Sequence, residues 1–325
     1  MDGKKVKVIH ITNMYPTDSH SYGGVFVRNQ IDSLGRHGLN IKLKCIGRPF
    51  GGYSRIFSFR TEINEADIIH CHFGHTGSLA LFWKLLERKP LVVSYCGDDL
   101  MGGVTEEGSY HLKGRLLASL NSLLSRYVDC AVVKSRQLAE KVKTKRVELI
   151  PNGVDMDLFR EMDKQKARKK IGLETDEERI FFFLGQKNEP VKNFSLFEKS
   201  LTYLNFKFKF FVLENISYKD VVYYMNAADV CVLTSLHEGS PNVIKEAMAC
   251  NRPIVSVDVG DVRELLGPVE GCFVVRHDPK EIAGAIRKSL DFQKTTARSR
   301  LLDLDLDLDG TAKRIIKLYE DILKK

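Results

Sequence analysis

A short turn in the C-terminal half of the chain has the composition of an anion site. It reads Gly-Ser-Pro-Asn (239–242) and separates an apolar run from a helical pattern. Pro241 fits the first position of a helix, where its missing N–H is tolerated, and Ser240 fits the N-cap before it. The amides of Asn242 and Val243 then lack intrahelical partners and lie at the positive end of the helix dipole. Because no acidic residue occupies that first turn, the pattern predicts a site for an external anion such as a diphosphate.

Two glutamates flank this turn. Glu238 precedes it, and Glu246 lies one helical turn beyond Asn242 on the same face. A carboxylate at position 246 can accept two hydrogen bonds from a cis-diol such as that of a ribose. A carboxylate at position 238 can reach a sugar attached on the far side of the phosphates. The simpler interpretation, an ordinary turn with two solvated glutamates, stays open at this point because short motifs have false positives.

Short β-branched runs alternate with helical patterns and form the framework around this turn. Strands are predicted at 6–11, 41–46, 67–70, 91–95, 130–133, 147–150, 180–184, 207–213, 230–233, 254–257 and 272–275. Helices are predicted between them, at 25–36, 77–86, 112–126, 164–170, 217–226 and 241–249. Buried strands separated by helices indicate parallel sheets covered on both faces. The expected fold class is therefore α/β, with two doubly wound, Rossmann-like domains facing a cleft.

The two domains are expected to meet near IPNGVDMDLF (150–159), where Pro, Asn and Gly favour a turn. Residues 1–153 form the predicted N-terminal domain and residues 154–325 the C-terminal domain, with a hinge near Asn152. Ligands of such sheets bind outside the carboxyl ends of the strands, which places the active site in the cleft. The alternating stretch LLDLDLDLDG (301–310) fits a half-buried strand, but we interpret it as a connection to the last helix, 311–325. That helix can pack back on the N-terminal domain.

The excess of basic charge is confined to the N-terminal half. Residues 1–153 hold 22 Lys and Arg against 14 Asp and Glu, and residues 154–325 hold 28 of each, so the first half carries the net charge of +8. An anionic partner, such as a phosphorylated substrate or an acidic membrane face, is expected to meet that half. The seven cysteines are scattered without a C-x-x-C pair, as in a reduced cytosolic protein. No signal-peptide pattern or membrane-length apolar run is seen, so any membrane contact is expected to be peripheral.

The spacing of Glu238 and Glu246, followed by AMACNRPIV (247–255) and Gly260-Asp261, closely resembles the family 4 retaining glycosyltransferases, which have the two-domain GT-B fold. The resemblance covers nearly the whole chain, and PNGVD (151–155) matches the usual interdomain crossing of the family. It implies that a sugar is transferred from a nucleotide-sugar donor without a metal ion or another cofactor. By the same resemblance, Glu246 holds the donor ribose, and Glu238 is a catalytic residue beside the sugar hydroxyls.

The resemblance also covers FFFLGQKNEPVKN (181–193), the loop after the first strand of the C-terminal domain. The family usually has Gly-Arg and then a lysine here, and both cations clamp the diphosphate. Lys192 matches the lysine, whereas Gln186 stands at the arginine position and cannot supply the same charge. Either Lys187 substitutes for that arginine or the site has one cation fewer. An exposed lysine-rich loop without a ligand is the remaining alternative.

In the N-terminal half, Gly23 and Gly24 of YGGVFVRNQ (22–30) join the first strand to a helix. A glycine pair at a helix start permits close backbone approach to a ligand, although it also forms tight turns. The resemblance places this loop near the donor phosphate and the acceptor. Arg28, on the helix that follows, is a candidate for an acceptor phosphate, with an ordinary surface position as the alternative.

SYCGDDL (94–100) ends another strand at the expected cleft. The family often has His-Gly-x-Asp at this point, so Asp99 matches an aspartate that we predict to be catalytic. Cys96 stands at the position of the histidine. A thiol cannot replace an imidazole as a proton carrier near neutral pH, which puts any role of that histidine in doubt for this chain.

HCHFGH (70–75) has the residue types of a metal cluster. His70 and His72 lie on one face of a strand, but no acidic ligand is adjacent and the resemblance implies no metal. We therefore expect no metal ion to be bound.

LKGRLLASLNSLLSRY (112–127) carries leucines at helical spacing together with three basic residues. A helix that faces the core is the default interpretation, and a membrane-surface helix is the alternative. In the second case the helix would act together with the neighbouring basic residues Lys141, Lys143, Lys145 and Arg146.

These observations predict a retaining, metal-independent glycosyltransferase of the cytoplasm, peripheral at the inner face of the membrane. Its C-terminal domain would bind a nucleotide diphosphate sugar, a UDP-sugar in our prediction, and its N-terminal domain a glycan or lipid-linked acceptor of cell-surface polysaccharide biosynthesis. Two rivals remain: a nucleotide-sugar 2-epimerase of the same fold, and a non-catalytic protein on this scaffold that binds membranes or polyanions. Nucleic acid is not expected as a partner, because no basic and aromatic recognition module is visible.

Overall fold

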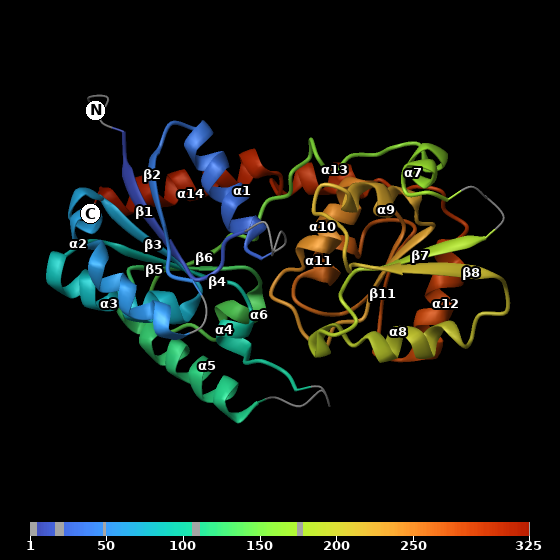
Figure 1. Cartoon of the computed structure of the whole chain (residues 1–325), viewed down its shortest axis with the longest axis horizontal. Coiled ribbons are helices and arrows are strands. Elements are labelled where there is room, and N and C mark those ends of the chain that lie inside the picture. Colours follow the sequence, from blue (N-terminus) through green and yellow to red (C-terminus); the bar gives the residue numbers. More distant parts are fainter. Residues whose placement is uncertain (1–4, 17–22, 48–49, 106–110, 174–177, 325) are drawn as a thin grey trace. The chain divides into compact units, whose positions relative to one another are not determined.

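The computed structural model describes residues 5–16, 23–47, 50–105, 111–173 and 178–324. The chain divides into two compact units, each built around its own sheet (Figure 1). Unit 1 comprises the described residues up to Gly103, those from His111 to Gly153, and those from Leu308 onward. Unit 2 comprises Val154–Asp307 together with Val104 and Thr105.

Unit 1 contains a six-stranded parallel sheet in the order β2-β1-β3-β4-β5-β6. Its strands are β1 (Lys7–Thr12), β2 (Asn40–Cys45), β3 (Ile68–His72), β4 (Leu91–Tyr95), β5 (Cys130–Val133) and β6 (Val147–Leu149). Its helices are α1 (Val25–Arg36), α2 (Arg60–Glu65), α3 (Gly74–Glu87), α4 (Asp98–Met101), α5 (Leu112–Leu124), α6 (Arg136–Ala139) and α14 (Leu308–Leu323), with 3-10 helices η1 (Phe50–Phe59) and η2 (Ser125–Tyr127). The strand order reverses between β1 and β3, as in doubly wound sheets.

Alternate residues of these strands face two separate cores. Ile9 and Ile69 pack in one core with Trp83 of α3. Their neighbours Val8 and Ile68 pack in the other core with side chains of α14, which runs beside α1 in Figure 1. Burial on both faces explains why the strands appear in the sequence as nearly continuous apolar runs.

Unit 2 contains a five-stranded parallel sheet in the order β11-β10-β9-β7-β8. Its strands are β7 (Arg179–Phe183), β8 (Phe208–Val212), β9 (Val230–Leu233), β10 (Ile254–Val257) and β11 (Cys272–Val275). Its helices are α7 (Lys164–Lys170), α8 (Phe194–Leu201), α9 (Val221–Ala227), α10 (Asn242–Ala249), α11 (Val262–Leu266), α12 (Pro279–Ser289) and α13 (Ala297–Asp303), with the 3-10 helix η3 (Pro190–Lys192). The strand order reverses between β7 and β9, so the loops that follow these two strands emerge next to each other.

The predicted α/β class with two doubly wound sheets is confirmed, whereas the alternating stretch 301–310 differs in detail. It is described throughout and contains no strand: α13 ends at Asp303, and α14 begins at Leu308, three residues before the predicted start. A single parallel bridge joins Val154 to Asp307 between the two helices. The buried leucines of this stretch, Leu301 and Leu306, are instead covered by helix packing and a turn. In the part of the chain that the structure describes, no helix has both the length and the apolar character needed to span a membrane.

Candidate active site

The loops that follow β7 and β9 are fastened to each other in unit 2. The amide of Leu236 donates to the carbonyl of Val191 (2.8 Å). The hydroxyl of Thr234 lies within hydrogen-bond distance of two carbonyls on the other loop, those of Lys192 (3.1 Å) and Asn193 (3.0 Å). These bonds fix the backbone of one loop relative to the other, and with it the side chains that both loops carry.

Two of the predicted site residues meet between these loops. The ammonium of Lys192 lies 2.7 Å from Oε1 of Glu238, and the hydroxyl of Ser235 donates to the same oxygen (2.8 Å). Both charged side chains are less than a fifth exposed (19% and 17%), so their attraction is screened less than that of a surface pair. Gly185 makes room for the lysine, because a Cβ there would lie 2.8 Å from Cγ of Lys192. Gln186, the next residue, is half-buried.

The turn before α10 differs by one residue from the sequence prediction. The helix begins at Asn242, and Pro241 is its N-cap with φ −68° and ψ 113°. Ser240 was predicted as the N-cap, and that prediction is wrong, because its hydroxyl donates to Oδ2 of Asp261 instead (2.7 Å). The residues of α10, all described, include no acidic side chain in the first turn. The amides of Asn242 and Val243 therefore lie at a positive helix end that no acidic residue of the helix neutralises.

Glu246 is buried on α10, with 7% of the residue exposed. Its Oε1 accepts a hydrogen bond from the hydroxyl of Tyr218 (3.0 Å). Burial raises the pKa of Glu246 from 4.5 to about 7, while the Tyr218 hydrogen bond and the charge of Lys245 act in the opposite direction. A buried carboxylate with such a pKa is typical of functional sites. Tyr218 was missed by the sequence reasoning, because no local spacing connects it with a residue 28 positions away.

The raised pKa of Glu246 predicts that the folded state loses stability as the pH rises. The folded protein binds more protons than the unfolded chain between pH 4.5 and 7, so the free energy of unfolding falls across that interval. The expected loss is about 3 kcal/mol. Glu246→Gln keeps an acceptor for Tyr218 but stays neutral, so this part of the pH dependence should disappear. Urea unfolding of both proteins at pH 5 and pH 7.5 measures the free energy of unfolding at each pH. An equal change in this free energy between the two pH values for both proteins would contradict the prediction.

The second lysine of the loop after β7 has other partners. The exposed ammonium of Lys187 lies over the rings of Phe194 (5.0 Å) and Phe210 (5.7 Å). Cation–π contacts of an exposed lysine are weak, so the substitution of Lys187 for the missing arginine stays a prediction. Of the two predicted lysines, the structure therefore brings Lys192 to the carboxylate of Glu238 and Lys187 to aromatic rings.

In unit 1, the glycine pair has a clear conformational reason. Gly24 is the N-cap of α1 and has φ +76°, a left-handed conformation that favours glycine. A Cβ at this position would lie 2.4 Å from the carbonyl oxygen of Met14, so the turn also requires the absence of a side chain. Gly23 and Arg28 are both half-buried, the first in the turn and the second on α1.

Asp99 is buried and accepts hydrogen bonds from three backbone amides, those of Gly74 (2.8 Å), Cys96 (3.0 Å) and Gly97 (2.9 Å). Burial raises the pKa of Asp99, and the three amides act against that rise. The carboxylate thereby ties the start of α3 to the loop after β4. The pKa of the Cys96 thiol is raised to about 12 by burial, so it stays neutral near pH 7. A catalytic role of Asp99 stays a prediction.

The histidines of β1 and β3 form a buried polar network beneath α14. Nδ1 of His10 and Nε2 of His72 lie 3.0 Å apart, and His70 contacts both the hydroxyl of Tyr319 and Oγ of Ser94 (2.8 Å). Burial lowers the pKa of His10 to about 3 and also lowers those of the other two imidazoles, so all three are neutral. In the part of the chain that is described, no group of His, Cys, Asp or Glu has the arrangement of a metal site.

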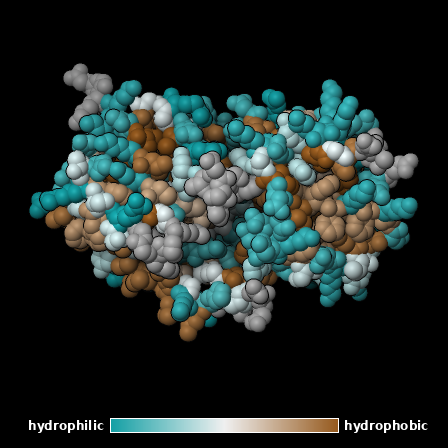
Figure 2. All heavy atoms as spheres, in the orientation of Figure 1, coloured by the Kyte–Doolittle hydropathy of each residue, from teal (hydrophilic) through white to brown (hydrophobic). Residues whose placement is uncertain are grey.

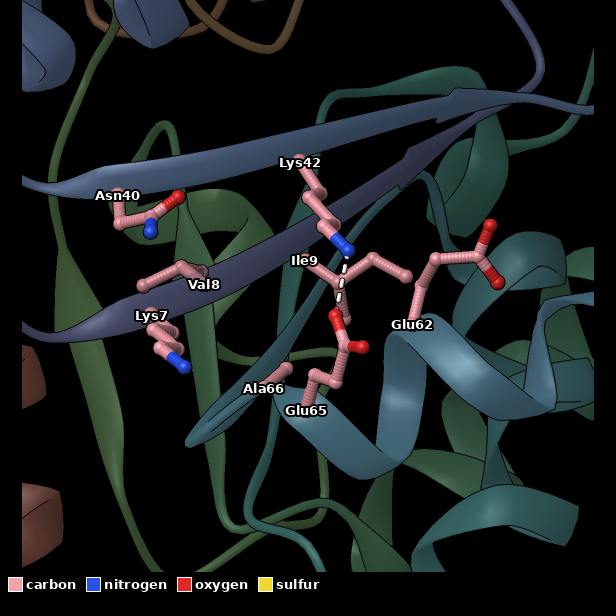
Figure 3. A pocket seen from close by; sticks show the side chains of 8 residues that line it. All are labelled: Lys7, Val8, Ile9, Asn40, Lys42, Glu62, Glu65 and Ala66. Carbon is pink, nitrogen blue, oxygen red and sulfur yellow. Dashed lines mark hydrogen bonds and ion pairs between the residues drawn. The ribbon is translucent and has the colours of Figure 1, made fainter.

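A pocket on unit 1 lies away from all of these residues. Figure 3 shows Lys42 of β2 pointing toward Glu65 of α2, with 2.6 Å between the charged atoms. The pocket is lined by Lys7, Val8, Ile9, Asn40, Lys42, Glu62, Glu65 and Ala66. It adjoins the first residues of β1 and β2, whereas ligands of parallel sheets bind at the carboxyl ends of the strands. We therefore do not include it in the candidate active site.

Comparison with known families agrees with this geometry. The two parallel α/β units have the architecture of the GT-B fold. A model described as "Glycosyl transferase 4-like domain" matches residues 5–153, and one described as "Glycosyl transferases group 1" matches residues 166–291. The chain belongs to the group 1 glycosyltransferases, and it is an enzyme of that class.

Individual relatives are distant but similar over most of their length. A Bacillus subtilis glycosyltransferase, assigned provisionally to teichuronic acid biosynthesis, is 24% identical over 87% of this chain and 89% of its own. Sucrose-phosphate synthase from Thermosynechococcus elongatus has a TM-score of 0.78 and 17% identity, over 98% of this chain and 100% of that one. The Anabaena protein HepE in complex with UDP-glucose has a TM-score of 0.71 and 16% identity, over 97% and 99% of the two chains. The similarity to the two solved structures concerns the fold alone.

Proposed function

We propose that the protein transfers a sugar with retention of configuration from a UDP-sugar to a glycan or lipid-linked acceptor, without a metal ion. The observation that carries the proposal is the pairing of Lys192 with Glu238 directly before the N-terminus of α10. This arrangement places a cation and helix-start amides near one carboxylate, while Glu246 lies behind them on the helix. A diphosphate between a sugar and a ribose has groups that match each of these.

The chemistry assigned to these residues is electrostatic. As the bond between sugar and diphosphate breaks, negative charge grows on the departing phosphate. Lys192 and the amides of Asn242 and Val243 would stabilise that charge, because they are held in place before the reaction begins. Glu238 would orient the sugar through its hydroxyls. The acceptor hydroxyl would attack from the same face as the leaving group departs, and its proton would pass to the departing phosphate oxygen. No side chain of the protein need form a covalent bond with the sugar in this scheme.

The choice of donor and pathway is supported by the relatives. HepE is described in complex with UDP-glucose, and the Bacillus relative is named for teichuronic acid biosynthesis. By analogy with these two relatives, we propose a UDP-sugar as the donor of the present protein and a cell-surface polysaccharide as its product. The basic N-terminal half is consistent with an acceptor that carries phosphate.

A thermal-shift screen tests the donor proposal directly. UDP, GDP, ADP and CMP, each with EDTA and then with Mg²⁺, would be added to the intact chain, and UDP should raise the Tm most in both conditions. A ligand at 100 times its Kd adds about 2.7 kcal/mol to the free energy of unfolding. No shift with any of these nucleotides would favour the non-catalytic alternative. Exchange of solvent deuterium into the UDP-sugar without an acceptor would favour the epimerase.

We also propose that unit 1 contacts an anionic membrane through an exposed apolar surface. Residues of α3 and α5 that are 47% to 78% exposed form this leucine face, and α3 and α5 contact each other. Its members are Phe82, Leu85, Leu86, Leu112, Leu116 and Leu120. Figure 2 shows hydrophobic residues gathered at the lower edge of the view, where Figure 1 places α5. The default interpretation of 112–127 was a helix whose leucines face the core, whereas Leu112, Leu116 and Leu120 are exposed.

Basic residues on α5 and on the segment bonded to its end favour an acidic bilayer as the partner of the leucine face. The stretch 112–127 contains three basic residues and no acidic one. The exposed lysines 141 and 143 lie on a segment that is bonded to the end of α5, through Ser122 to the carbonyl of Lys141 and through the amide of Lys143 to Ser125. Arg146 is less available, because it pairs with Glu148 and Asp321.

Two sets of substitutions separate the apolar and the charged contributions to this contact. Leu112→Ser with Leu116→Ser should weaken binding to phosphatidylglycerol vesicles by about tenfold or more, since burying a leucine contributes about 1.5–3 kcal/mol. Lys141→Gln, Lys143→Gln and Lys145→Gln together should weaken it and reduce its salt dependence, at about 1 kcal/mol for each charge. Cosedimentation with the vesicles measures both effects. Equal binding of the unchanged protein to phosphatidylcholine and phosphatidylglycerol vesicles would refute the charged contribution.

A further inference from the structure

Three buried polar side chains are hydrogen-bonded in series beneath the turn that leads into α10. Ser240, Lys245 and Asp261 are 8%, 1% and 7% exposed. The hydroxyl of Ser240 donates to Oδ2 of Asp261 (2.7 Å), and the ammonium of Lys245 donates to the oxygen of the same hydroxyl (3.0 Å). Because a serine has one proton to give, these two bonds fix its direction: the lysine donates, the serine relays, and the carboxylate accepts.

The backbone brings the turn and the loop after β10 into direct contact at the same place. Gly260 has φ +58°, and a Cβ there would lie 2.7 Å from the carbonyl oxygen of Gly239. Only a residue without a side chain permits this approach. Asp261 is the next residue, so its carboxylate is delivered to Ser240 by a loop whose position is set by backbone contact.

Lys245 and Asp261 are both buried, so solvent screens the attraction between their charges only weakly. Burial raises the pKa of Asp261, and the charge of Lys245 and the Ser240 hydrogen bond oppose that rise. Oδ1 of Asp261 is buried and has no hydrogen-bond partner among the described residues, so its charge is compensated mainly on the side of Ser240. Removal of one member of a buried, hydrogen-bonded charge pair leaves the other uncompensated, which is far more disruptive than removal of both.

We propose that Lys245 and Asp261 are positioning residues of the donor site, which act through Ser240 to hold the turn between Glu238 and α10. The turn carries the catalytic glutamate at one end and the helix-start amides at the other. Its geometry depends on a contact with a loop that follows a different strand. Neither residue touches the donor in this proposal. The proposal rests on the function proposed above for the effect on turnover, but the fixing of the turn itself is a property of the protein without ligand.

Hydrogen exchange of the free protein tests the fixing of the turn. In Lys245→Met and in Asp261→Asn, the amides of Gly239, Ser240, Asn242 and Val243 should exchange about tenfold faster or more, while amides in β9 and β10 stay as they are. The double variant should exchange more slowly than either single variant, because it leaves no uncompensated charge. Asp258→Asn is the matched control, since Asp258 lies in the same loop but pairs on the surface with Arg263 (2.7 Å, 47% and 65% exposed).

The affinity for UDP and the rate of sugar transfer complete the experiment. Well below the Tm of each variant, both single variants should bind UDP about tenfold more weakly and transfer more slowly, with partial recovery in the double variant. A lower Tm with unchanged exchange at the turn and unchanged UDP affinity would overturn the proposal. The hydrogen bonds among Lys245, Ser240 and Asp261 would then only stabilise the fold. If the unchanged protein binds no UDP, the proposed function fails, and the exchange measurement still decides whether the turn is fixed in this way.

Discussion

Replacing Glu238 with glutamine is expected to lower the rate of sugar transfer by about a hundredfold or more. The carboxylate holds the ammonium of Lys192 at 2.7 Å and accepts from Ser235, and in the proposed reaction it also meets the hydroxyls of the sugar. Glutamine keeps the shape but removes the charge from this point. The affinity for UDP itself should change little, because the variant keeps Lys192 as the cation proposed for the diphosphate. Transfer assays with the UDP-sugar and titration calorimetry with UDP separate the two quantities.

A control for this prediction lies on α8. Glu198 is exposed, so Glu198→Gln makes the same chemical change outside the site and should leave both the rate and the affinity unchanged. Lys192→Met is the complementary variant and should weaken UDP binding as well as the rate, since the cation is lost. The assigned roles would be reversed if Glu238→Gln lost UDP affinity while its rate at saturating donor stayed near that of the unchanged protein.

Glu246→Ala is expected to weaken UDP binding by tenfold or more. In the proposed complex this carboxylate accepts hydrogen bonds from the ribose, and hydrogen bonds to a charged group contribute about 1.5–3 kcal/mol each. Affinity for UDP should also rise with pH through about 7 in the unchanged protein, because the ligand requires the ionised form of a group whose pKa lies there. The variant should lack this pH dependence. Calorimetry with UDP from pH 6 to pH 8 measures both effects.

Inorganic pyrophosphate and a tyrosine variant make the test of Glu246 specific. Pyrophosphate has no ribose, so its affinity should be nearly the same in Glu246→Ala and in the unchanged protein. Tyr218→Phe removes the hydroxyl that donates to Glu246 at 3.0 Å but keeps the carboxylate, and it should reduce UDP affinity far less than Glu246→Ala does. An equal loss of UDP and pyrophosphate affinity in Glu246→Ala would place the residue beside the phosphates rather than the ribose.

The positions of the central strands were predictable because these strands are buried on both faces. The predicted and observed limits coincide for β4, β5, β9, β10 and β11. The leucine and aspartate alternation at 301–310 fits a strand by its period alone, but the interpretation as a connection to the last helix is confirmed, because one helix ends and another begins there. The start of α10 was displaced for a different reason. The hydroxyl of Ser240 fits an N-cap by local rules, but Asp261, 21 residues later, takes it.

The charged residues of the site show the same division between local and distant causes. Lys192 and Glu238 were selected from separate motifs, and the pairing of β7 with β9 brings them together. Lys187 was predicted as a possible cation for the diphosphate, and its contacts with Phe194 of α8 and Phe210 of β8 come from elements that its own loop sequence does not reveal. Lys245 was not selected at all, although one signal was present: it lies in a helix whose other residues are mostly apolar. A lysine in such a helix is buried and requires a partner.

The place of α14 in unit 1 has a consequence for synthesis of the chain. The face of the first sheet that carries Val8, Val92 and Val132 is covered by α14, which the ribosome makes only after all of Val154–Asp307. At about 5–20 residues per second, that face waits roughly 10 to 30 s for its cover. During this time the nascent first half presents an apolar sheet surface to solvent or to a chaperone. The half of the enzyme that is translated first is thus the half that finishes folding last.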